Sequence, residues 1–256
     1  MRKVITIKTD EEIELMRQSG QRLAKVHEVL HAALKPGIST LELDQIGEDT
    51  IRSLGGIPNC KNYEGFPASV CISVNDEVVH GIPSADRILQ EGDIVTFDTG
   101  LIYKGYHSDA ARTWGVGKIS DEAQKLIDVT RESFFEGIKK AKAGHRLHEI
   151  SRAIDDYINP YGYGIVRELT GHGIGTSLHE EPMVPNYKKL LPGVKLKKGM
   201  TICVEPMITM GERYVGWLDD DWTVVTVDGS PAAHYENTIA ITDGEPEILT
   251  MLEDEE

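Results

Sequence analysis

The sequence predicts an α+β fold in which two related halves contribute strands that meet in the middle. Three features support this prediction: helical patterns that open with a Ser or Thr cap, strand-like runs that carry acidic residues, and an internal similarity at a constant offset along the chain. A chain of 256 residues has the length of one large domain. We therefore expect a single domain over residues 1–256, with halves at about 9–115 and 120–245.

Each half is expected to contain a long helix that is capped at its first turn. The first helix opens at Thr9-Asp-Glu-Glu12 and the second at Ser120-Asp-Glu122. In both segments a hydroxyl side chain precedes acidic residues, which the helix dipole stabilises in the first turn.

Asp98 and Asp109 are predicted to lie on the two arms of one β-hairpin. The run Ile94–Phe97 is rich in β-branched and aromatic residues, and Lys104-Gly105 suits a two-residue turn with positive φ. Such a turn pairs positions whose numbers add up to 209, so Asp98 lies opposite Ala111, with Asp109 two residues along on the same face. A turn one residue tighter would pair the two acids directly. A bound metal ion would compensate their repulsion, but a solvated face or a salt-bridged pair is an alternative that the hairpin alone leaves open.

The constant offset gives Asp98 a counterpart in the second half. The segment Leu89–Asp98 aligns with Leu196–Glu205 at an offset of 107 (196 minus 89), so Glu205 corresponds to Asp98. The same offset relates Lys35-Pro-Gly37 to Lys142-Ala-Gly144 and Glu42-Leu43 to Glu149-Ile150. A His-x-x-Pro motif also precedes each acidic strand, at His80–Pro83 and His179–Pro182.

The end of the chain is predicted to be rich in strands. Trp222–Val227 and His234–Ile241 flank Asp228-Gly229, and we expect them to form a second hairpin that carries Glu236. The acidic end Glu253–Glu256 is expected to be a frayed tail.

Composition excludes several classes of protein. With 42 acidic and 27 basic residues the formal charge is -15, which argues against general nucleic-acid binding, and no contact with DNA is expected. No apolar run approaches the length of a membrane span, and the N-terminus lacks the apolar region of a signal peptide, so we expect no membrane association. The three cysteines, Cys60, Cys71 and Cys203, are an odd number that favours free thiols in a reducing compartment. We therefore expect a cytoplasmic protein.

One basic segment interrupts this acidic composition. Five lysines lie close together around Leu190–Val194: Lys188, Lys189, Lys195, Lys197 and Lys198. The segment is either a solvated charged loop or a contact with an anionic partner, and the sequence leaves both interpretations open.

The remaining candidate residues suggest a metal centre. His172 lies in Thr170-Gly-His-Gly-Ile-Gly175, where glycines permit close backbone approach, although a core histidine in a flexible turn is an alternative. A phosphate-binding loop is disfavoured, because the spacing is not that of a P-loop and no Lys-Ser/Thr follows the last glycine. Glu205 ends an apolar strand before Pro206, and Glu236 alternates with apolar neighbours. The set Asp98, Asp109, His172, Glu205 and Glu236 suffices for two divalent ions about 3.5–4 Å apart, and such sites perform metal-assisted hydrolysis.

These motifs together resemble type I methionine aminopeptidases, in their short bacterial form. The resemblance extends over nearly the whole chain and rests on the segments Val74–Pro83, Asp98–Asp109, Thr170–Gly175, His179–Pro182, Val204–Met207 and Tyr235-Glu236. It implies the pseudo-twofold "pita-bread" fold that prolidases, aminopeptidase P and creatinase share, with a central antiparallel sheet covered by helices. Residues 1–256 would then form a single catalytic domain.

The resemblance also implies roles for the metal-binding residues. Asp98 would chelate one ion, Asp109 and Glu236 would bridge both ions, and His172 and Glu205 would complete the second site. Glu205 would also be the proton shuttle. Carboxylate and imidazole ligands accept Co²⁺, Mn²⁺, Fe²⁺ and Zn²⁺, so the identity of the two divalent ions stays open.

By the same resemblance, two histidines and an apolar pocket would bind the substrate. His80 would hydrogen-bond the scissile amide near its nitrogen, and His179 would contact the substrate carbonyl and stabilise the oxyanion. The methionine side chain would lie among sulfur and aromatic groups, namely Cys60, Tyr63, Phe66, Cys71 and Trp222. Leu178 and Phe66 stand where many relatives carry Phe and Tyr, which predicts an altered pocket shape.

The implied activity is removal of the initiator methionine from nascent proteins and peptides that have a small second residue. The expected partners are nascent polypeptide N-termini, with transient ribosome contact through Lys188–Lys198, and the expected state is a monomer. Xaa-Pro peptidase action is an alternative, although such relatives usually carry a separate N-terminal domain. A binding module that has lost catalysis is another, although such proteins typically lose metal ligands.

Overall fold

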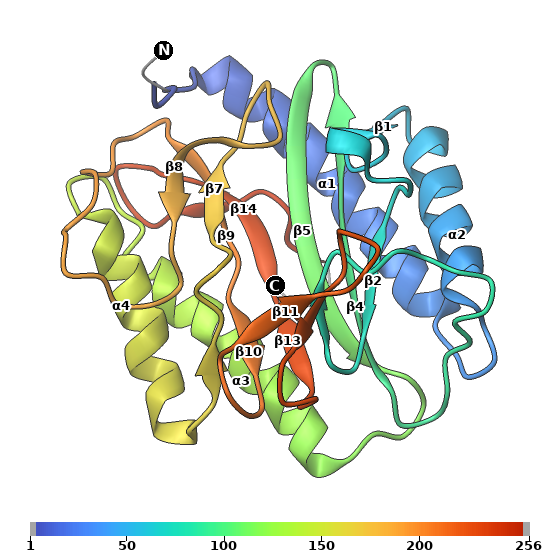
Figure 1. The fold of residues 1–256 in the computed structure, drawn as a ribbon. Helices are drawn as coiled ribbons and strands as arrows, with labels where there is room; N and C mark the ends of the chain where they lie inside the picture. Colours follow the sequence, from blue (N-terminus) through green and yellow to red (C-terminus); the bar gives the residue numbers. More distant parts are fainter. Residues whose placement is uncertain (1–3, 253–256) are drawn as a thin grey trace.

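The computed structural model describes residues 4–252, which form an antiparallel sheet with α-helices packed on it (Figure 1). The α-helices are α1 (Asp10–Ala33), α2 (Thr40–Ser53), α3 (Asp121–Ile138) and α4 (Leu147–Ile158). The N-caps predicted at Thr9 and Ser120 are confirmed, because their hydroxyls accept from the backbone amides of Glu12 and Ala123 at the starts of α1 and α3. None of these helices has both the length and the apolar character that crossing a membrane requires.

The central sheet has nine strands among the described residues and runs in the order β1-β4-β5-β14-β9-β7-β8, with β2 paired to β4 and β15 to β14. Its strands are β1 (Ile57–Pro58), β2 (Cys71–Val74), β4 (Ile94–Tyr103), β5 (Tyr106–Gly115), β7 (Gly171–Gly173), β8 (Glu180–Val184), β9 (Thr201–Val204), β14 (Glu236–Ala240) and β15 (Glu247–Ile248). All of these pairings are antiparallel. The predicted central antiparallel sheet covered by helices is therefore confirmed.

Two smaller sheets complete the fold. One contains β6 (Gly164–Ile165), β10 (Met207–Thr209) and β13 (Ala232–His234), and the other contains β3 (Glu77–Val79), β11 (Val215–Trp217) and β12 (Val224–Thr226). Short 3₁₀ segments lie at Tyr63–Gly65 (η1) and Asn159–Tyr161 (η2).

The β4–β5 hairpin has the predicted register. Asp98 lies opposite Ala111 and Gly100 opposite Asp109, so the two acids share one face, two residues apart. Lys104 and Gly105 have φ values of 49° and 86°, as a two-residue turn of this kind requires. The alternative of a turn one residue tighter is wrong.

The internal repeat is visible at the entrances to α2 and α4. Gly37 and Gly144 both have positive φ, at 89° and 95°. The carboxylate of Glu42 accepts from the amide of Ser39 at 2.9 Å, and that of Glu149 from the amide of Arg146 at 2.7 Å. Isolated bridges join Ser39 to Ile88 and Arg146 to Lys195, again at the offset of 107 (146 minus 39 and 195 minus 88).

The two halves meet where β5 pairs with β14. In this register Glu236 lies opposite Ala111, which itself lies opposite Asp98. On its other edge β14 pairs with β9, whose last residue directly precedes Glu205. Each half packs its own apolar core against its helices, with Leu23 and Phe97 in one and Leu126 and Ile202 in the other.

The predicted hairpin around Asp228-Gly229 is wrong. The strand β12 pairs with β11 and β3, β13 pairs with β10, and β14 belongs to the central sheet. The turn itself forms, but the Asp228 carboxylate accepts from the amide of Glu212 at 2.7 Å, in the loop between β10 and β11. Asp228 therefore bonds to a residue outside the turn. After the turn the chain enters β13, which belongs to a different sheet from β12.

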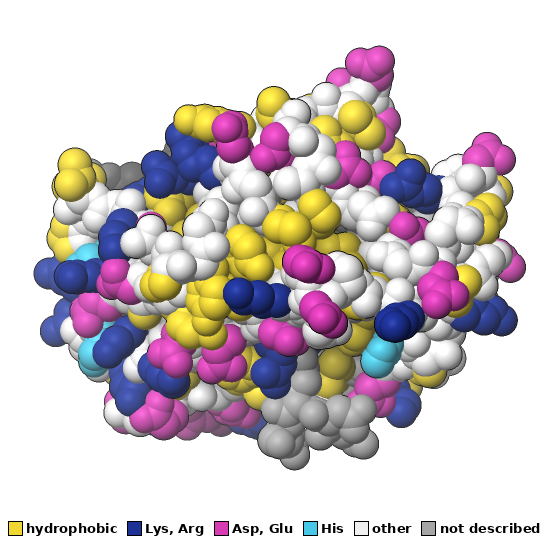
Figure 2. All heavy atoms as spheres, turned by 90° about the horizontal axis from the view of Figure 1, so that it is seen from below, with side chains coloured by type: hydrophobic (Ala, Val, Ile, Leu, Met, Phe, Trp, Pro, Cys, Tyr) yellow, Lys and Arg dark blue, Asp and Glu magenta, His cyan; other side chains and the backbone are white. Residues whose placement is uncertain are grey.

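The face drawn in Figure 2 has mixed charge. Figure 2 shows acidic and basic side chains interspersed among hydrophobic ones on the face that it presents. The predicted frayed tail at Glu253–Glu256 lies outside the described residues.

Candidate active site

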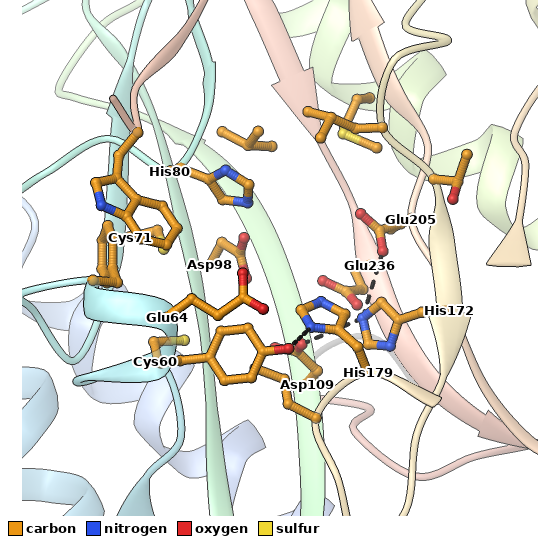
Figure 3. A pocket seen from close by; sticks show the side chains of 18 residues that line it. Cys60, Glu64, Cys71, His80, Asp98, Asp109, His172, His179, Glu205 and Glu236 are labelled. Atoms are coloured by element: carbon orange, nitrogen blue, oxygen red, sulfur yellow. Dashed lines mark hydrogen bonds and ion pairs between the residues drawn. The ribbon is translucent and has the colours of Figure 1, made fainter. Parts of the chain in front are cut away.

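Every predicted site residue lines one cavity of about 430 Å³ (Figure 3). The lining includes the five predicted metal ligands Asp98, Asp109, His172, Glu205 and Glu236, and the predicted substrate-binding residues Cys60, Tyr63, Phe66, Cys71, His80, His179 and Trp222. Leu178 lines the same cavity. Residues separated by up to 176 positions (236 minus 60) therefore come together at the junction of the two halves.

Four neighbouring strands deliver the carboxylates. Asp98 comes from β4 and Asp109 from β5, whereas Glu236 begins β14 and Glu205 follows β9. The side-chain amide of Asn186 donates to the carbonyl oxygen of Glu205 at 2.9 Å and fixes its backbone. Asp109, Glu205 and Glu236 are all buried, so four acids gather in a space from which much of the water is excluded.

Burial and mutual repulsion raise the pKa of each of these carboxyls. Burial raises the pKa of Asp98 to about 7. Burial and then the charge of Asp98 raise the pKa of Asp109 well above its usual value, and burial followed by the other carboxylates does the same for Glu205 and Glu236. A nearby cation would reverse these effects, because it favours the ionised form of every carboxyl around it.

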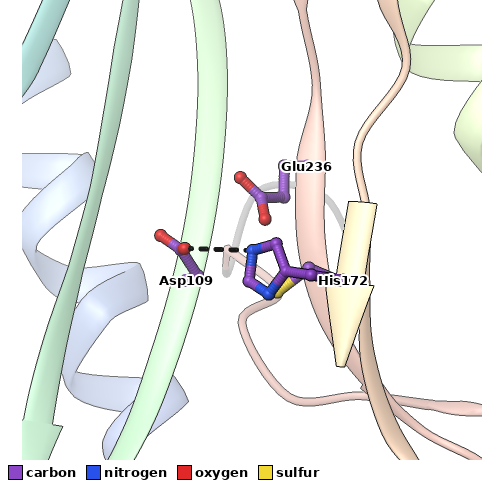
Figure 4. A group of neighbouring side chains, drawn as sticks. Asp109, His172 and Glu236 are labelled. Atoms are coloured by element: carbon purple, nitrogen blue, oxygen red, sulfur yellow. Dashed lines mark ion pairs between the residues drawn. The ribbon is translucent and has the colours of Figure 1, made fainter. Parts of the chain in front are cut away.

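His172 presents one ring nitrogen to the carboxylates. Its Nδ1 donates to the carbonyl oxygen of Gly173 at 2.8 Å, so Nε2 carries the lone pair. That Nε2 lies 3.7 Å from a carboxylate oxygen of Asp109 and 3.7 Å from one of Glu205, and Figure 4 shows it with Asp109 and Glu236. Burial lowers the pKa of His172 to about 3, so the ring is neutral at pH 7 and suited to bind a metal.

The glycines around His172 are required by packing. A Cβ at Gly171 would lie 2.3 Å from the carbonyl oxygen of Cys203, and one at Gly173 would lie 2.2 Å from that of Glu181. Only glycine therefore lets β7 fit between β8 and β9 at this point. The glycines of this motif therefore allow the strands to approach closely, which accounts for them without a phosphate-binding loop.

The donor set fits a divalent cation. The ligand atoms of Asp109, His172, Cys203 and Glu236 all lie within 4.8 Å of one another. Within residues 4–252, one oxygen of Asp109 and one of Glu236 are buried without any hydrogen-bond partner, and such atoms are costly unless something binds them. Oxygen and imidazole ligands of this kind are typical of Mn²⁺, Fe²⁺, Co²⁺ and Zn²⁺ sites.

Two further histidines, His80 and His179, line the cavity with the carboxylates. His80 has a φ of 60° and stands edge-on to Trp222, with ring centroids 6.1 Å apart. His179 packs edge-on against His172 at 4.2 Å, and its Nδ1 lies 2.7 Å from the hydroxyl of Tyr63. Both rings are thus held by neighbours at the wall of the cavity (Figure 3).

An apolar pocket adjoins the carboxylates. Cys60, Phe66, Ala68 and Cys71 form a buried cluster, on which Trp222 packs edge-on to Phe66 at 5.2 Å. Sulfur atoms and aromatic edges of this kind favour a flexible thioether chain.

Sequence reasoning missed three residues near the carboxylates. Cys203 lies on β9, two residues before Glu205, and its thiol lies 3.5 Å from the hydroxyl of Thr238. The alternation of side chains along a strand, which places residues 203 and 205 on the same face, was the available signal. His234 is buried, with Nε2 3.8 Å from Glu205 and 3.9 Å from Glu236. Glu64 also lines the cavity, from the 3₁₀ segment η1, and no sequence pattern singled it out.

Comparison with known proteins identifies the family. The profile of metallopeptidase family M24 matches residues 14–243. The chain belongs to this family. The M24 protein is 53% identical to a methionine aminopeptidase of Clostridium acetobutylicum over 250 residues, which cover 98% of this chain and 100% of the relative.

Solved structures agree. A methionine aminopeptidase of Thermotoga maritima superimposes with a TM-score of 0.94 at 40% identity, with 96% of this chain and 99% of that chain covered. A prolidase of Pyrococcus furiosus superimposes with a TM-score of 0.79 at 25% identity, and the match covers 96% of this chain but only 66% of the prolidase. The predicted pita-bread fold and the predicted resemblance to type I methionine aminopeptidases are confirmed.

Proposed function

We propose that this M24 protein is a methionine aminopeptidase, which removes the N-terminal methionine from nascent proteins and peptides with a small second residue. One observation supports this proposal above all: the cavity joins four carboxylates, three of them buried, and His172 to an apolar pocket of sulfur and aromatic groups. The first part suits metal-assisted hydrolysis, and the second suits a thioether side chain.

The metal-binding residues would share two divalent ions. Asp98 would bind one ion, Asp109 and Glu236 would bind both, and His172 and Glu205 would complete the second site. Divalent ions held in this way lower the pKa of a water molecule and so supply a nucleophile at neutral pH. The partnerless oxygens of Asp109 and Glu236 support the shared role, because each has a coordination position to fill.

Other residues would handle protons and the substrate amide. Glu205 would accept a proton from the attacking water and pass it to the leaving amine. His80 would hydrogen-bond the scissile amide near its nitrogen, and His179 would donate to the substrate carbonyl oxygen as negative charge develops there. The contact between Tyr63 and His179 supports this assignment, because it holds the imidazole at the cavity wall.

The methionine side chain would occupy the pocket formed by Cys60, Phe66, Cys71 and Trp222, with Tyr63 at its edge. Leu178 is 5% exposed and would shape the neighbouring wall. Nascent polypeptide N-termini are the proposed partners. We also propose that residues 1–256 act as one catalytic domain of two related halves, as a monomer in the cytoplasm; the free Cys60, Cys71 and Cys203 support a reducing compartment.

Hydrolysis of defined peptides tests the proposal. Purified protein loaded with Mn²⁺, Fe²⁺ or Co²⁺ should release methionine from Met-Ala-Ser and little from Met-Leu-Ser, and Asp109→Asn should remove the activity. Xaa-Pro peptidase action predicts cleavage of an Xaa-Pro dipeptide instead, and the lower identity to the prolidase, 25% against 53% for the methionine aminopeptidase of Clostridium acetobutylicum, disfavours it. A folded, metal-loaded protein that releases no methionine would contradict the proposed function.

A second proposal concerns ribosome contact through Lys188–Lys198. Lys188 pairs with Asp156 at 2.5 Å and Lys198 with Asp243 at 3.2 Å, so part of the charge is compensated internally. Leu190 and Leu191 are 104% and 77% exposed, which supports a contact role for the loop. Co-sedimentation with ribosomes at low salt should weaken in a Lys195→Glu/Lys197→Glu variant, whereas unchanged co-sedimentation would contradict this proposal.

A further inference from the structure

We propose that the buried ion pair between Lys8 and Glu180 positions both His172 and His179 at the active site. The proposal rests on the proposed function, and it makes Lys8 and Glu180 positioning residues that touch neither the substrate nor the metal ions. It assigns a role to the segment before α1, which lies outside the duplicated halves.

Three groups fix the Glu180 carboxylate. The ammonium of Lys8 lies 2.7 Å from Oε2, the hydroxyl of Thr6 donates to the same oxygen at 2.6 Å, and the amide of Ser177 donates to Oε1 at 3.3 Å. The two side chains of the pair are only 5% and 10% exposed. Although burial raises the pKa of Glu180, the hydrogen bonds from Lys8 and Thr6 bring it below its usual value, so the carboxylate is charged at pH 7.

The pair is attached to the framework of the site. The backbone amide of Lys8 donates to the carbonyl oxygen of Gly199 at 2.7 Å, immediately before β9. Glu180 is the first residue of β8 and follows His179 directly. In the pairing of β7 with β8, Glu180 lies opposite Gly173, the neighbour of His172.

Gly175 shows how closely the pair packs on the segment that carries both histidines. A Cβ at Gly175 would lie 2.5 Å from Cε of Lys8 and 2.6 Å from Oε1 of Glu180. On the other side the amide of His107 in β5 donates to the carbonyl oxygen of Gly175 at 2.8 Å. The segment 171–180 is therefore clamped between the ion pair and β5, and the two imidazoles meet edge-on at 4.2 Å.

A positioning role explains why an ion pair occupies this place. Burying two charges costs solvation energy that an apolar pair of similar volume would not, so a buried ion pair by itself is weak evidence for stability. Three donors on one carboxylate instead fix the position of the main chain next to His179. Small displacements of a metal ligand or of an oxyanion donor have large effects on affinity and rate.

The test compares Lys8→Met with Lys8→Arg and with Arg17→Met. Arg17 is the control for loss of a different ion pair, because its guanidinium pairs with Glu247 at 2.5 Å and joins α1 to β15 without lining the cavity. Each variant is measured by titrating Mn²⁺ into metal-free protein in a calorimeter, and by kcat and KM for Met-Ala-Ser. We expect Lys8→Met to bind Mn²⁺ about 10–100-fold more weakly and to lose at least about tenfold in kcat, with KM changed little. Lys8→Arg should recover most of both losses, and Arg17→Met should behave as the unchanged protein does.

Two results would overturn the proposal. One is unchanged Mn²⁺ affinity and kcat in Lys8→Met, and the other is an equal loss in Arg17→Met, which would indicate a general effect of stability. If Lys8→Met does not fold, Glu180→Gln replaces it, since the amide removes the charge and still accepts from Thr6. If the unchanged protein cleaves no methionyl peptide, the proposed function fails, while the Mn²⁺ affinities of the same variants still decide the positioning role.

Discussion

Replacing Asp98 by Asn should stabilise the metal-free protein, and increasingly so as the pH rises. Burial raises the pKa of Asp98 from 3.8 to about 7 in the folded chain. The folded state therefore favours the protonated carboxyl of Asp98. The contribution of this protonated carboxyl to the free energy of unfolding is fully present below about pH 4 and is lost as the pH rises toward 7. Asn cannot ionise and avoids the loss.

The size of the effect follows from the shift in pKa. The pKa of Asp98 rises by about 3 on folding, and each tenfold change in proton affinity corresponds to about 1.36 kcal/mol. The effect on the free energy of unfolding is therefore roughly 4 kcal/mol as an upper limit. The difference in free energy of unfolding between Asp98→Asn and the unchanged protein should therefore widen by up to that amount between about pH 4 and pH 7. The difference is the quantity to measure, because desolvation lowers the pKa values of His27, His80, His172 and His234, which makes the absolute stability fall at low pH in both proteins.

Urea unfolding with EDTA at several pH values measures this difference. The matched control is Glu91→Gln, an exposed carboxylate outside the cavity, for which the difference should stay constant. Saturating Mn²⁺ should reverse the order of the two proteins, since the unchanged protein binds the ion more tightly and gains stability from it. A difference in free energy of unfolding that stays constant or narrows as the pH rises would refute the inference that folding raises the pKa of Asp98.

Three further substitutions have defined outcomes. Gly173→Ala places a Cβ 2.2 Å from a carbonyl oxygen of β8, and it should weaken Mn²⁺ binding at least about tenfold in calorimetry. Gly216→Ala is the control, because a Cβ there has nothing within 4 Å and should leave Mn²⁺ binding unchanged. Equal Mn²⁺ affinities in the two variants would contradict the packing argument. Phe66→Ala opens the apolar pocket and should raise KM for Met-Ala-Ser by about tenfold or more in steady-state assays, and an unchanged KM would show that methionine binds elsewhere. Asp109→Asn should retain its fold by circular dichroism while bound Mn²⁺ falls below that of the unchanged protein by elemental analysis; full metal content would argue against Asp109 as a shared ligand.

The parts of the fold that local rules determine were predictable. The turn at Lys104-Gly105 fixes the register of β4 and β5, so the placement of Asp98 and Asp109 on one face followed from the sequence. The internal repeat related Glu205 to Asp98 without any knowledge of the strand pairing.

The parts that depend on distant contacts were not predictable. The strands β12 and β14 were expected to pair with each other, but β12 pairs with β3, which belongs to the first half and lies far away along the chain. Cys203 and His234 have no motif of their own, and only the assembled sheet brings them to the carboxylates. The contact of Lys8 with Glu180 joins residues 172 positions apart, beyond the range of any periodic pattern.

The place of β14 in the sheet has a consequence for synthesis. Chains are made from the N-terminus, yet β14 is one of the last strands to emerge and occupies the middle of the sheet, between β5 and β9. Until Glu236–Ala240 has been made, β5 and β9 lack the strand that pairs with both of them. The carboxylates of the two halves are then not held side by side in one sheet. A chain that stops before β14 therefore has no assembled metal centre, and the order of the strands delays activity until residues 236–240 have been synthesised.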